Sequence, residues 1–307
     1  MSLTQTAREE SRPTGEVSSL DSGARTRPTV VLAGASLCIA AALLLGFVIN
    51  LAVLGSLTQH RDQKVAFDAL RVQLAKGTAA VSPKGVDGRL LPLGTPMAIL
   101  SIPSLGVKQV VFEGTTSRVL THGPGHQRSS VLPGQAGSSV VMARRAAFGG
   151  PFAGLPNIRK GARIQTTTGQ GAATYTVVNV LEGARAATGT ADLPENRLTL
   201  ITAGGLPFVA SGVVRVEAVL QGTPQPAPPA AIADSALPAA EAALAGDSSA
   251  WVGLVFWLQA LILASVGIIW LWLRWGRRQA WVITVPVVLL LAMCAMNQAA
   301  LLLPNVL

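Results

Sequence analysis

Cysteine is nearly absent from this sequence of 307 residues, which contains only Cys38 and Cys294. Both lie inside long apolar stretches, so the chain between those stretches carries no thiol. That part of the chain can form no disulfide, hold no zinc ion through cysteine and use no cysteine nucleophile. The missing thiols exclude more chemistry than any motif in the chain does.

Charged residues are also scarce, at 13% of the chain, whereas 50% of the residues are hydrophobic. The apolar residues concentrate in three uncharged stretches, 29–57, 251–273 and 279–307. A helix of about 20 apolar residues crosses a bilayer, so each stretch predicts a transmembrane helix. The first is too long and begins too late for a cleavable signal peptide, and we interpret it as a retained anchor.

Positive residues beside the three stretches indicate their orientation. Arg25 and Arg27 precede the first stretch, and the loop RWGRRQ at 274–279 separates the other two. Arginine next to a span favours the cytoplasmic side. We therefore expect a cytoplasmic N-terminus, residues 58–250 outside the cell, and an outward C-terminus. All six tryptophans lie in or beside the last two stretches, as in an aromatic belt.

The formal net charge of +9 raises the question of nucleic-acid binding. The basic residues outside the apolar stretches are scattered rather than arranged in a stripe, and their region is expected to face away from nucleic acid. The glycine-containing stretch TGQGAATY, at 168–175, is too weak a pattern for a phosphate-binding loop. We expect the lipid bilayer as a partner, no nucleic acid and no cofactor.

Between the apolar stretches the composition changes three times. Residues 58–94 read as a helix that leaves the membrane and ends near Gly77, followed by a linker with proline and glycine. Residues 95–220 contain seven or eight short β-type runs with glycine or proline at the breaks and two short helical pieces, which predicts a small barrel or sandwich. Residues 221–250 are rich in proline and alanine and predict an extended tether.

The expected organisation has eight parts. In chain order these are a disordered cytoplasmic tail (1–28), a first span (29–57), a membrane-exit helix and linker (58–94), a β domain (95–220), a tether (221–250), a second span (251–273), a cytoplasmic loop (274–279) and a third span (280–303).

The order of short motifs between about Thr95 and Leu220 resembles that of a sortase, the cell-surface cysteine transpeptidase of Gram-positive bacteria. The pieces that carry the resemblance are ILSIPSLGVKQVVFEGTT (99–116), LTHGPGHQRSSVLPGQAGSSVVMARR (120–145), FAGLPNIRKGARIQTTTGQGAATYTVVNV (152–180) and LTLITA (198–203). No single piece is specific, but together they keep the family's order. The resemblance implies a mainly β fold, a closed sortase-like barrel of seven to eight strands with short helices, beside the three transmembrane helices.

Sortase chemistry, as the resemblance implies it, needs a cysteine nucleophile, a histidine that moves protons and an arginine that stabilises the oxyanion. The cysteine position corresponds to Ala203 and the histidine position to Arg144. The arginine position falls at Ser211 or Gly212; Arg215 follows a few residues later and cannot be assumed to replace it. The chain therefore departs from the family's pattern at all three positions.

The side chains at these three positions agree with the loss of the sortase reaction. Alanine carries no nucleophile, and the guanidinium of Arg144 stays protonated at biological pH, so it cannot act as a general base. It could instead bind a carboxylate or phosphate, or be an ordinary solvated residue at a strand end. Neighbouring residues on a strand face opposite sides, so only one of Arg144 and Arg145 would enter the groove. The candidate groove-binding residues are Arg144, Arg145, Thr202, His126 and Arg215.

Two histidines, His122 and His126, are spaced as a metal pair or a base could be. We favour the alternative that they belong to a glycine- and proline-containing turn, and we expect no metal site. The hydroxyls near Ala203 have no sequence context that would activate them.

Three functions remain open on the sequence. We favour a membrane-anchored extracytoplasmic pseudo-sortase in the cell membrane that binds an envelope protein or an anionic envelope ligand. The alternatives are a transpeptidase or hydrolase with a non-standard active site, and a structural subunit of a larger membrane assembly.

Overall fold

The computed structural model of the chain describes residues 37, 41, 43–85, 87–183, 186, 194–275 and 277–307. Residues 45–307 form one compact unit, and the fold below is that of this unit. Three parts of the sequence lie outside the described residues. These are the polar tail expected over 1–28, most of the first part of the span expected over 29–57, and Cys38.

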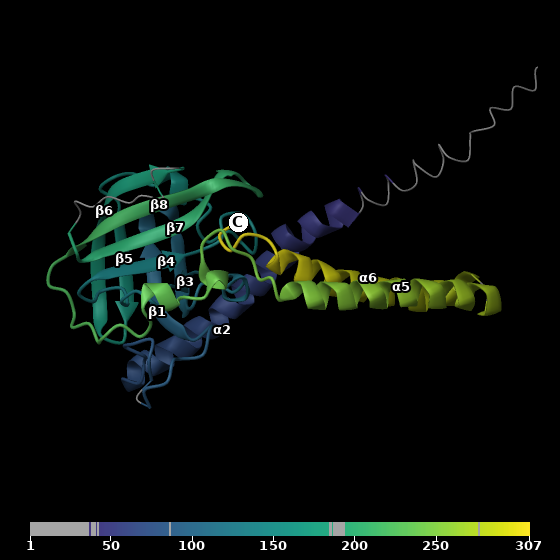
Figure 1. Cartoon of the computed structure of the whole chain (residues 1–307), viewed down its shortest axis with the longest axis horizontal. Coiled ribbons are helices and arrows are strands. Elements are labelled where there is room, and N and C mark those ends of the chain that lie inside the picture. The colour runs from purple at the N-terminus through teal and green to yellow at the C-terminus, as the bar shows by residue number, and fades with distance from the viewer. Residues whose placement is uncertain are drawn as a thin grey trace, which may run out of the picture. The chain divides into compact units, whose positions relative to one another are not determined.

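Eight strands form a closed barrel, in agreement with the sequence (Figure 1). Their bounds are β1 Pro96–Ile102, β2 Val107–Glu113, β3 Gly125–His126, β4 Ser138–Met142, β5 Arg163–Thr168, β6 Gly171–Glu182, β7 Arg197–Leu206 and β8 Val209–Gln221. Around the barrel the order is β1-β2-β3-β4-β7-β8-β6-β5, closed by the antiparallel pair of β1 and β5. The β2/β3 and β4/β7 pairs are parallel and the others antiparallel.

Alternation with period two fills the barrel, because successive side chains of a strand point to opposite faces. The inward residues of β8, Val214, Val216 and Ala218, are at most 1% exposed. They pack with inward residues from the other long strands, such as Leu198 and Leu200 of β7. The apolar alternation read from the sequence therefore specifies both the strands and the core.

Short helical pieces interrupt the barrel, and two of them, α3 and η3, lie in the stretches 115–123 and 149–158 where the sequence predicts helical structure. The helix α3, Ser117–Leu120, is capped by Thr116, whose Oγ1 accepts a hydrogen bond from the Val119 amide. The 3-10 turns η2 (Pro103–Leu105) and η3 (Leu155–Asn157) each have proline in their first turn.

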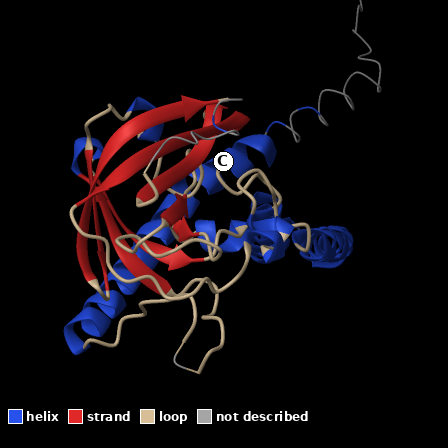
Figure 2. Ribbon diagram, turned by 60° about the vertical axis from the view of Figure 1, so that its left-hand side comes forward, coloured by secondary structure: helices blue, strands red, loops and turns tan. Residues whose placement is uncertain are grey.

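The helix α2, Gly55–Lys76, follows a π-helical turn, η1, at Asn50–Leu54, and ends at Gly77 with φ 65°. It runs along the outside of the barrel (Figures 1 and 2), where Ala66 and Leu70 pack with Val110 and Phe112 of β2. Glycine tolerates the left-handed conformation that closes the helix.

Three described helices are long and apolar enough to cross a membrane, as expected: Leu43–Lys76, Ala250–Ile268 and Thr284–Leu301. The last two lie in α5, Ala250–Trp275, and α6, Arg277–Leu301, which run side by side in Figure 1. A polar contact joins the first helix to the third, since Asn50 Nδ2 donates to Asn297 Oδ1 at 3.1 Å.

Residues 221–250 contain two 3-10 turns, η4 at Asp234–Ala236 and η5 at Ala239–Glu241. The second turn is fixed to the barrel side: Thr115 Oγ1 donates to the Glu241 carbonyl at 2.7 Å and Arg128 Nε to the Glu241 carboxylate at 3.0 Å. The carboxylate of Glu241 is fully buried. The segment therefore packs at this turn, although its composition is that of an extended tether.

Candidate functional site

Ala203, where the resemblance places the family's nucleophile, lies near the end of β7. Ala203 is 1% exposed, and the hydroxyl of its neighbour Thr202 donates to the Ala143 carbonyl at 2.9 Å. Because β4 and β7 are parallel neighbours, their carboxyl ends meet at one edge of the sheet. The loop after β4, residues 143–150, therefore lies beside Ala203.

The chain's own C-terminus occupies this edge. The carbonyl of Val306 accepts hydrogen bonds from the amides of Ala203 (3.2 Å) and Arg145 (3.1 Å). The side chain of Val306 is fully buried in a cluster with Leu120, Met142 and Ala203. The place in front of Ala203 is thus filled by residues that follow the third membrane-length helix.

The last residue is held by the same loop. The amides of Ala146 and Ala147 both donate to the backbone oxygen of Leu307 at 3.4 Å, and the Leu307 amide closes a turn onto the Pro304 carbonyl at 3.0 Å. Leu307 is 4% exposed. Sequence reasoning missed this docking, because residues 304–307 look like the uncharged end of a span.

Arg144 is completely buried and is not a solvated strand-end residue. Its Nη2 donates to the hydroxyl of Ser117 at 2.7 Å and to the Ser117 carbonyl at 3.1 Å, and its Cζ lies 5.1 Å from the centre of the Phe148 ring. Among the described residues, Nε and Nη1 have no hydrogen-bond partner. Burial lowers the pKa of Arg144 to about 10, so the guanidinium remains charged at neutral pH.

Arg145 is half-buried and turns toward the end of β7. Its Nη1 donates to the carbonyls of Ala203 at 3.2 Å and Gly205 at 2.5 Å. These carbonyls flank an irregularity in the β7/β8 pairing between Ala203 and Gly205. Both arginines therefore lie near Ala203, and each is engaged with groups of the protein itself.

The candidates on β8 lie across from β7. Ser211 is exposed, and Gly212 has φ 104°, in the region that favours glycine. Arg215 is opposite Ile201, and its Nε lies 3.1 Å from the buried carboxylate of Glu217. An arginine is thus present on this strand, but it is paired with a carboxylate of its own strand.

His126 and His122 have separate partners. His126, on β3, is buried, with Nδ1 3.0 Å from Glu113 Oε2 and Nε2 3.0 Å from the Val131 carbonyl. His122 Nδ1 lies 2.6 Å from Asp62 Oδ2 on α2. No three His, Cys, Asp or Glu side chains gather around one point in the part of the chain that the structure describes.

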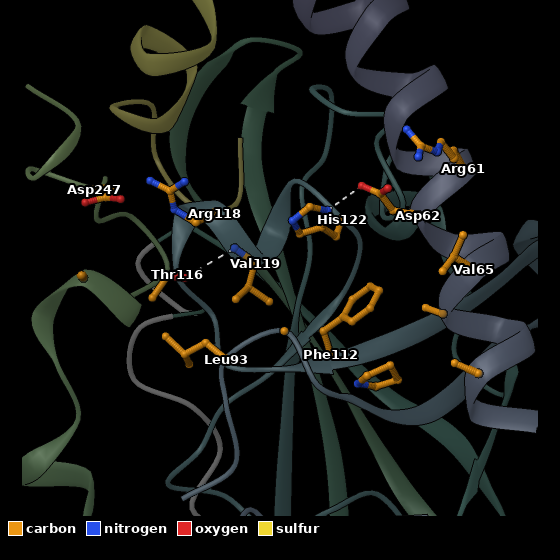
Figure 3. A pocket seen from close by; sticks show the side chains of 15 residues that line it. Arg61, Asp62, Val65, Leu93, Phe112, Thr116, Arg118, Val119, His122 and Asp247 are labelled. Atoms are coloured by element: carbon orange, nitrogen blue, oxygen red, sulfur yellow. Dashed lines mark hydrogen bonds and ion pairs between the residues drawn. The ribbon is translucent and has the colours of Figure 1, made fainter. Parts of the chain in front are cut away.

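A pocket of about 670 Å³ lies between α2 and the barrel (Figure 3). Its polar side chains include Arg61, Asp62, Arg118, His122 and Asp247, and its apolar ones include Val65, Leu93, Phe112 and Val119. Sequence reasoning missed the pocket because α2 had no assigned partner. A usable signal was the helical spacing of Gln59, Gln63, Ala66 and Leu70: Gln63 hydrogen-bonds the backbone of Val110 and Gln59 the side chain of Gln109.

Residues 100–216 match the family model of the sortase domain. The chain is similar to the Clostridium perfringens sortase D5 transpeptidase, with 19% identity over 53% of this chain and 99% of that chain and a TM-score of 0.42. It is also similar to sortase E from Streptomyces avermitilis, with 28% identity, coverage of 44% and 93%, and a TM-score of 0.38. A third similar structure is sortase C-1 from Actinomyces oris, with 25% identity, coverage of 42% and 75%, and a TM-score of 0.37.

No curated protein matches the chain. The family match begins within β1 and ends within β8, so it includes the positions of Arg144 and Ala203. The part of the β-barrel between residues 100 and 216 is therefore a sortase domain.

Proposed function

We propose that this protein is a membrane-anchored, extracytoplasmic member of the sortase family that does not cleave or transfer peptides, and that it acts as a binding or scaffold component of the cell envelope. The proposal rests on one observation. Ala203, at the position proposed for the nucleophile, carries no reactive group and is buried against the side chain of Val306. Three lines of argument support it.

The first is the lack of a nucleophile next to a base. Residues 58–250 contain no cysteine. The hydroxyl of the neighbouring residue Thr202 is buried and donates to the Ala143 carbonyl, so no base takes its proton. A transpeptidase with a rebuilt site would need a hydroxyl or thiol within hydrogen-bond reach of a basic group.

The second is the state of Arg144. A guanidinium that remains protonated cannot accept the proton of a nucleophile. Its Nη2 is already used on Ser117, and the residue is fully buried. Arg144 therefore contributes positive charge and packing beneath the groove.

The third is the way in which the 143–150 loop joins the barrel to the membrane-length helices. Besides holding the C-terminus, it donates from the Phe148 amide to the Leu51 carbonyl of η1 at 3.2 Å. In η1 the Gly55 amide bonds to Asn50 rather than Leu51, which leaves the Leu51 carbonyl free to accept. The 143–150 loop thus attaches the barrel to the membrane-length helices. A catalytic site would keep this loop open, whereas a scaffold requires such an attachment.

The same attachment supports the proposed orientation. The Asp247 amide, ahead of α5, donates to the Leu301 carbonyl at the end of α6 at 2.9 Å. The start of α5 and the end of α6 therefore lie together, near the barrel that binds Val306. With the arginine-rich loop at 274–279 in the cytoplasm, the barrel and the C-terminus are both outside.

The test uses the full-length protein in lipid nanodiscs, incubated with sorting-signal peptides and an amine acceptor, with products measured by mass spectrometry. We expect no cleavage, no transfer and no labelling by a thiol-directed vinyl sulfone at residues 58–250. An active sortase serves as the positive control for the assay. Turnover by the wild-type protein that persists in a variant with Cys38 and Cys294 replaced by alanine would overturn the proposal.

A further inference from the structure

We infer that the end of the β7/β8 hairpin inserts its apolar side chains into the surface of the lipid bilayer that holds this protein's helices, and so fixes the barrel edge at Ala203 against the membrane. The inference rests on the membrane anchoring in the proposed function and goes beyond it, because it names a second surface that contacts lipid. The hairpin tip, as used below, consists of residues 204–210, GGLPFVA.

The hairpin tip lies in the middle of a long uncharged stretch. No charged residue occurs between Arg197, at the start of β7, and Arg215, within β8. Turn residues are usually Gly, Pro, Asn, Asp or Ser, whereas this turn is Pro-Phe between leucine and valine. The turn therefore lacks the polar side chains that would suit it to water.

Three large apolar side chains of the tip are exposed. Leu206 is 71% exposed, Val209 63% and Phe208 37%. Leu206 and Val209 are directly paired across the hairpin, so their side chains lie on the same face. Among the residues that the structure describes from β1 to β8, no other large apolar side chain is exposed. Exposed apolar side chains that gather at one place mark an interaction site.

The backbone at Phe208 indicates that its aromatic side chain has a use. Phe208 has φ 63°, in the left-handed region that favours glycine and is rare for a bulky residue. Pro207 suits such a turn, because proline is common at the position before a residue with positive φ. Glycine at position 208 would close the same turn without strain, so the turn itself does not account for phenylalanine.

The tip extends beyond the neighbouring strand of the barrel. Strand β4 pairs with β7 only as far as Met142 and Ile201, whereas β7 continues with β8 alone to Leu206. At a rise of about 3.3 Å per residue, the overhang of residues 202–206 is about 16 Å long. The apolar tip is thus held away from the barrel core.

The overhang points to the side of the barrel where the membrane-length helices are attached. The loop after β4 donates from the Phe148 amide to the carbonyl of Leu51, in the first of these helices, and from the Arg145 amide to the carbonyl of Val306, in the segment after α6. Because β4 and β7 are parallel, β7 leaves the barrel on this same side. Figure 1 shows the end of the hairpin on the side of the barrel from which α5 and α6 extend.

A bilayer surface is the occupant that fits these features. Phenylalanine and leucine on an interfacial element bury at the boundary between lipid headgroups and acyl chains. At the base of the tip, the guanidinium of Arg145 donates to the carbonyls of Ala203 and Gly205, and its charge favours anionic headgroups. A second copy of the chain or a soluble protein would be a different occupant, and the experiment separates these cases from lipid.

The experiment uses full-length protein in nanodiscs with one copy per disc, in a background where Cys38 and Cys294 are replaced by alanine. Val209→Cys is compared with Ala172→Cys, an exposed position in the β5/β6 hairpin. The two hairpins lie at opposite ends of the barrel: β6 and β7 are both antiparallel to β8, and one hairpin precedes β6 while the other follows β7.

We expect a water-soluble maleimide to label Val209→Cys at least about tenfold more slowly than Ala172→Cys, although the Val209 side chain is exposed in the protein alone. Equal rates would overturn the inference. A dye attached to each cysteine by prolonged labelling then identifies what covers the tip. A nitroxide on the lipid acyl chains should quench the dye at position 209 and not the dye at position 172. Slow labelling without quenching would mean that protein covers the tip, and would also overturn the inference.

Phe208→Gly is a second variant that preserves the fold, because glycine adopts the positive φ without strain. Added to Val209→Cys, it should raise the labelling rate at least about threefold, since the tip loses apolar burial in the bilayer. The rate of Ala172→Cys should not change. An unchanged rate at position 209 would contradict the insertion of Phe208. Cleavage or transfer of sorting-signal peptides would contradict the proposed function and leave this inference standing, so the two failures are distinguishable.

Discussion

The Nη2 atom of Arg144 lies 2.7 Å from the hydroxyl of Ser117, and this hydrogen bond joins the loop after β4 to the short helix α3. Both residues are fully buried. The bond places a positive charge in the interior beneath the barrel edge, with the Phe148 ring over the guanidinium. Arg144 is therefore part of the buried structure beneath the barrel edge, and replacing it should change the stability of the fold.

Replacing Arg144 separates two contributions to the free energy of unfolding, that of its side-chain volume and that of its buried charge. Burial lowers the pKa of Arg144 to about 10, well below its ordinary value, because desolvation disfavours the charged form. Arg144→Ala should lower the free energy of unfolding by about 2–4 kcal/mol, because it leaves a cavity. Arg144→Met fills much of that volume without a buried charge and should be more stable than Arg144→Ala. Thermal unfolding in detergent, followed by circular dichroism, measures the difference.

The difference in the free energy of unfolding between the wild type and Arg144→Met should depend on pH, and its sign follows from the pKa of Arg144. The folded pKa of Arg144 is depressed to about 10, so between that pH and the higher pKa of the unfolded chain, the unfolded chain holds this proton more strongly than the folded chain. Stability contributed by Arg144 should therefore rise with pH through that window and stay constant below it. The wild type should gain stability relative to Arg144→Met above about pH 10. A gain that is already present between neutral pH and pH 9 would contradict this assignment.

Tyr175 is the only tyrosine of the chain, so its ionisation can be observed without interference. It is 1% exposed, and its phenolic oxygen accepts a hydrogen bond from the Gly134 amide at 2.5 Å. Burial raises the pKa of Tyr175 to about 12, from 10.0. The phenolate absorbance should therefore appear near pH 12 in the folded protein and near pH 10 after unfolding.

The stability contributed by Tyr175 changes with pH in the opposite direction to that contributed by Arg144. Because the unfolded tyrosine loses its proton first, stability should fall as pH rises from about 10 toward 12. Tyr175→Phe removes this fall together with the absorbance signal. The variant also leaves the Gly134 amide without its acceptor, at a cost of about 1–3 kcal/mol. A tyrosine that titrates near pH 10 in the folded protein would show that the barrel interior is hydrated there.

The sequence predicts the barrel well because strand patterns are local. Alternating apolar residues, as in Val214 and Val216, specify which face is buried. The order of short motifs predicts the sortase domain that residues 100–216 match. That Ala203 and Arg144 stand at the family's nucleophile and histidine positions stays a prediction. Each motif consists of residues close together in the chain.

Contacts between distant segments could not be predicted. Val306 reaches Ala203 and Arg145 through backbone hydrogen bonds, which leave no mark on side-chain composition. The burial of Arg144 depends on Ser117, in a different element, whereas its own neighbourhood reads as an ordinary strand end. Glu241 is one of three acidic residues in the proline- and alanine-rich segment 221–250, and composition alone does not show that its carboxylate is buried.

The proposed orientation can be tested with single cysteines in a background where Cys38 and Cys294 are replaced by alanine. Ser235→Cys lies in an exposed turn of the segment between barrel and α5 and should react with a membrane-impermeant maleimide on intact cells. Gln279→Cys, beside the arginine-rich loop, should react only after the cells are opened. The reverse pattern of labelling would contradict the orientation.

A cysteine at position 203 would place a thiol where the resemblance puts the nucleophile, and its reactivity tests whether Val306 covers this position. In the same cysteine-free background, Ala203→Cys places a thiol beneath Val306, where the native methyl group is 1% exposed. A buried thiol reacts only when the structure opens locally. We therefore expect labelling by a maleimide to be at least about tenfold slower than for the exposed control Ser235→Cys, since tenfold corresponds to about 1.4 kcal/mol of protection.

Val306→Ala provides the matched comparison, because it shortens the covering side chain without moving the Val306 carbonyl or the terminal carboxylate. Added to Ala203→Cys, it should increase the labelling rate toward that of Ser235→Cys. Neither variant should cleave or transfer peptides, because Arg144 cannot take the proton of the thiol and catalytic groups act as a unit. If Ala203→Cys were labelled as fast as Ser235→Cys, the C-terminus would not cover the site. If it turned over peptides, another residue would have to supply the base, and the proposal that the groove only binds would fail.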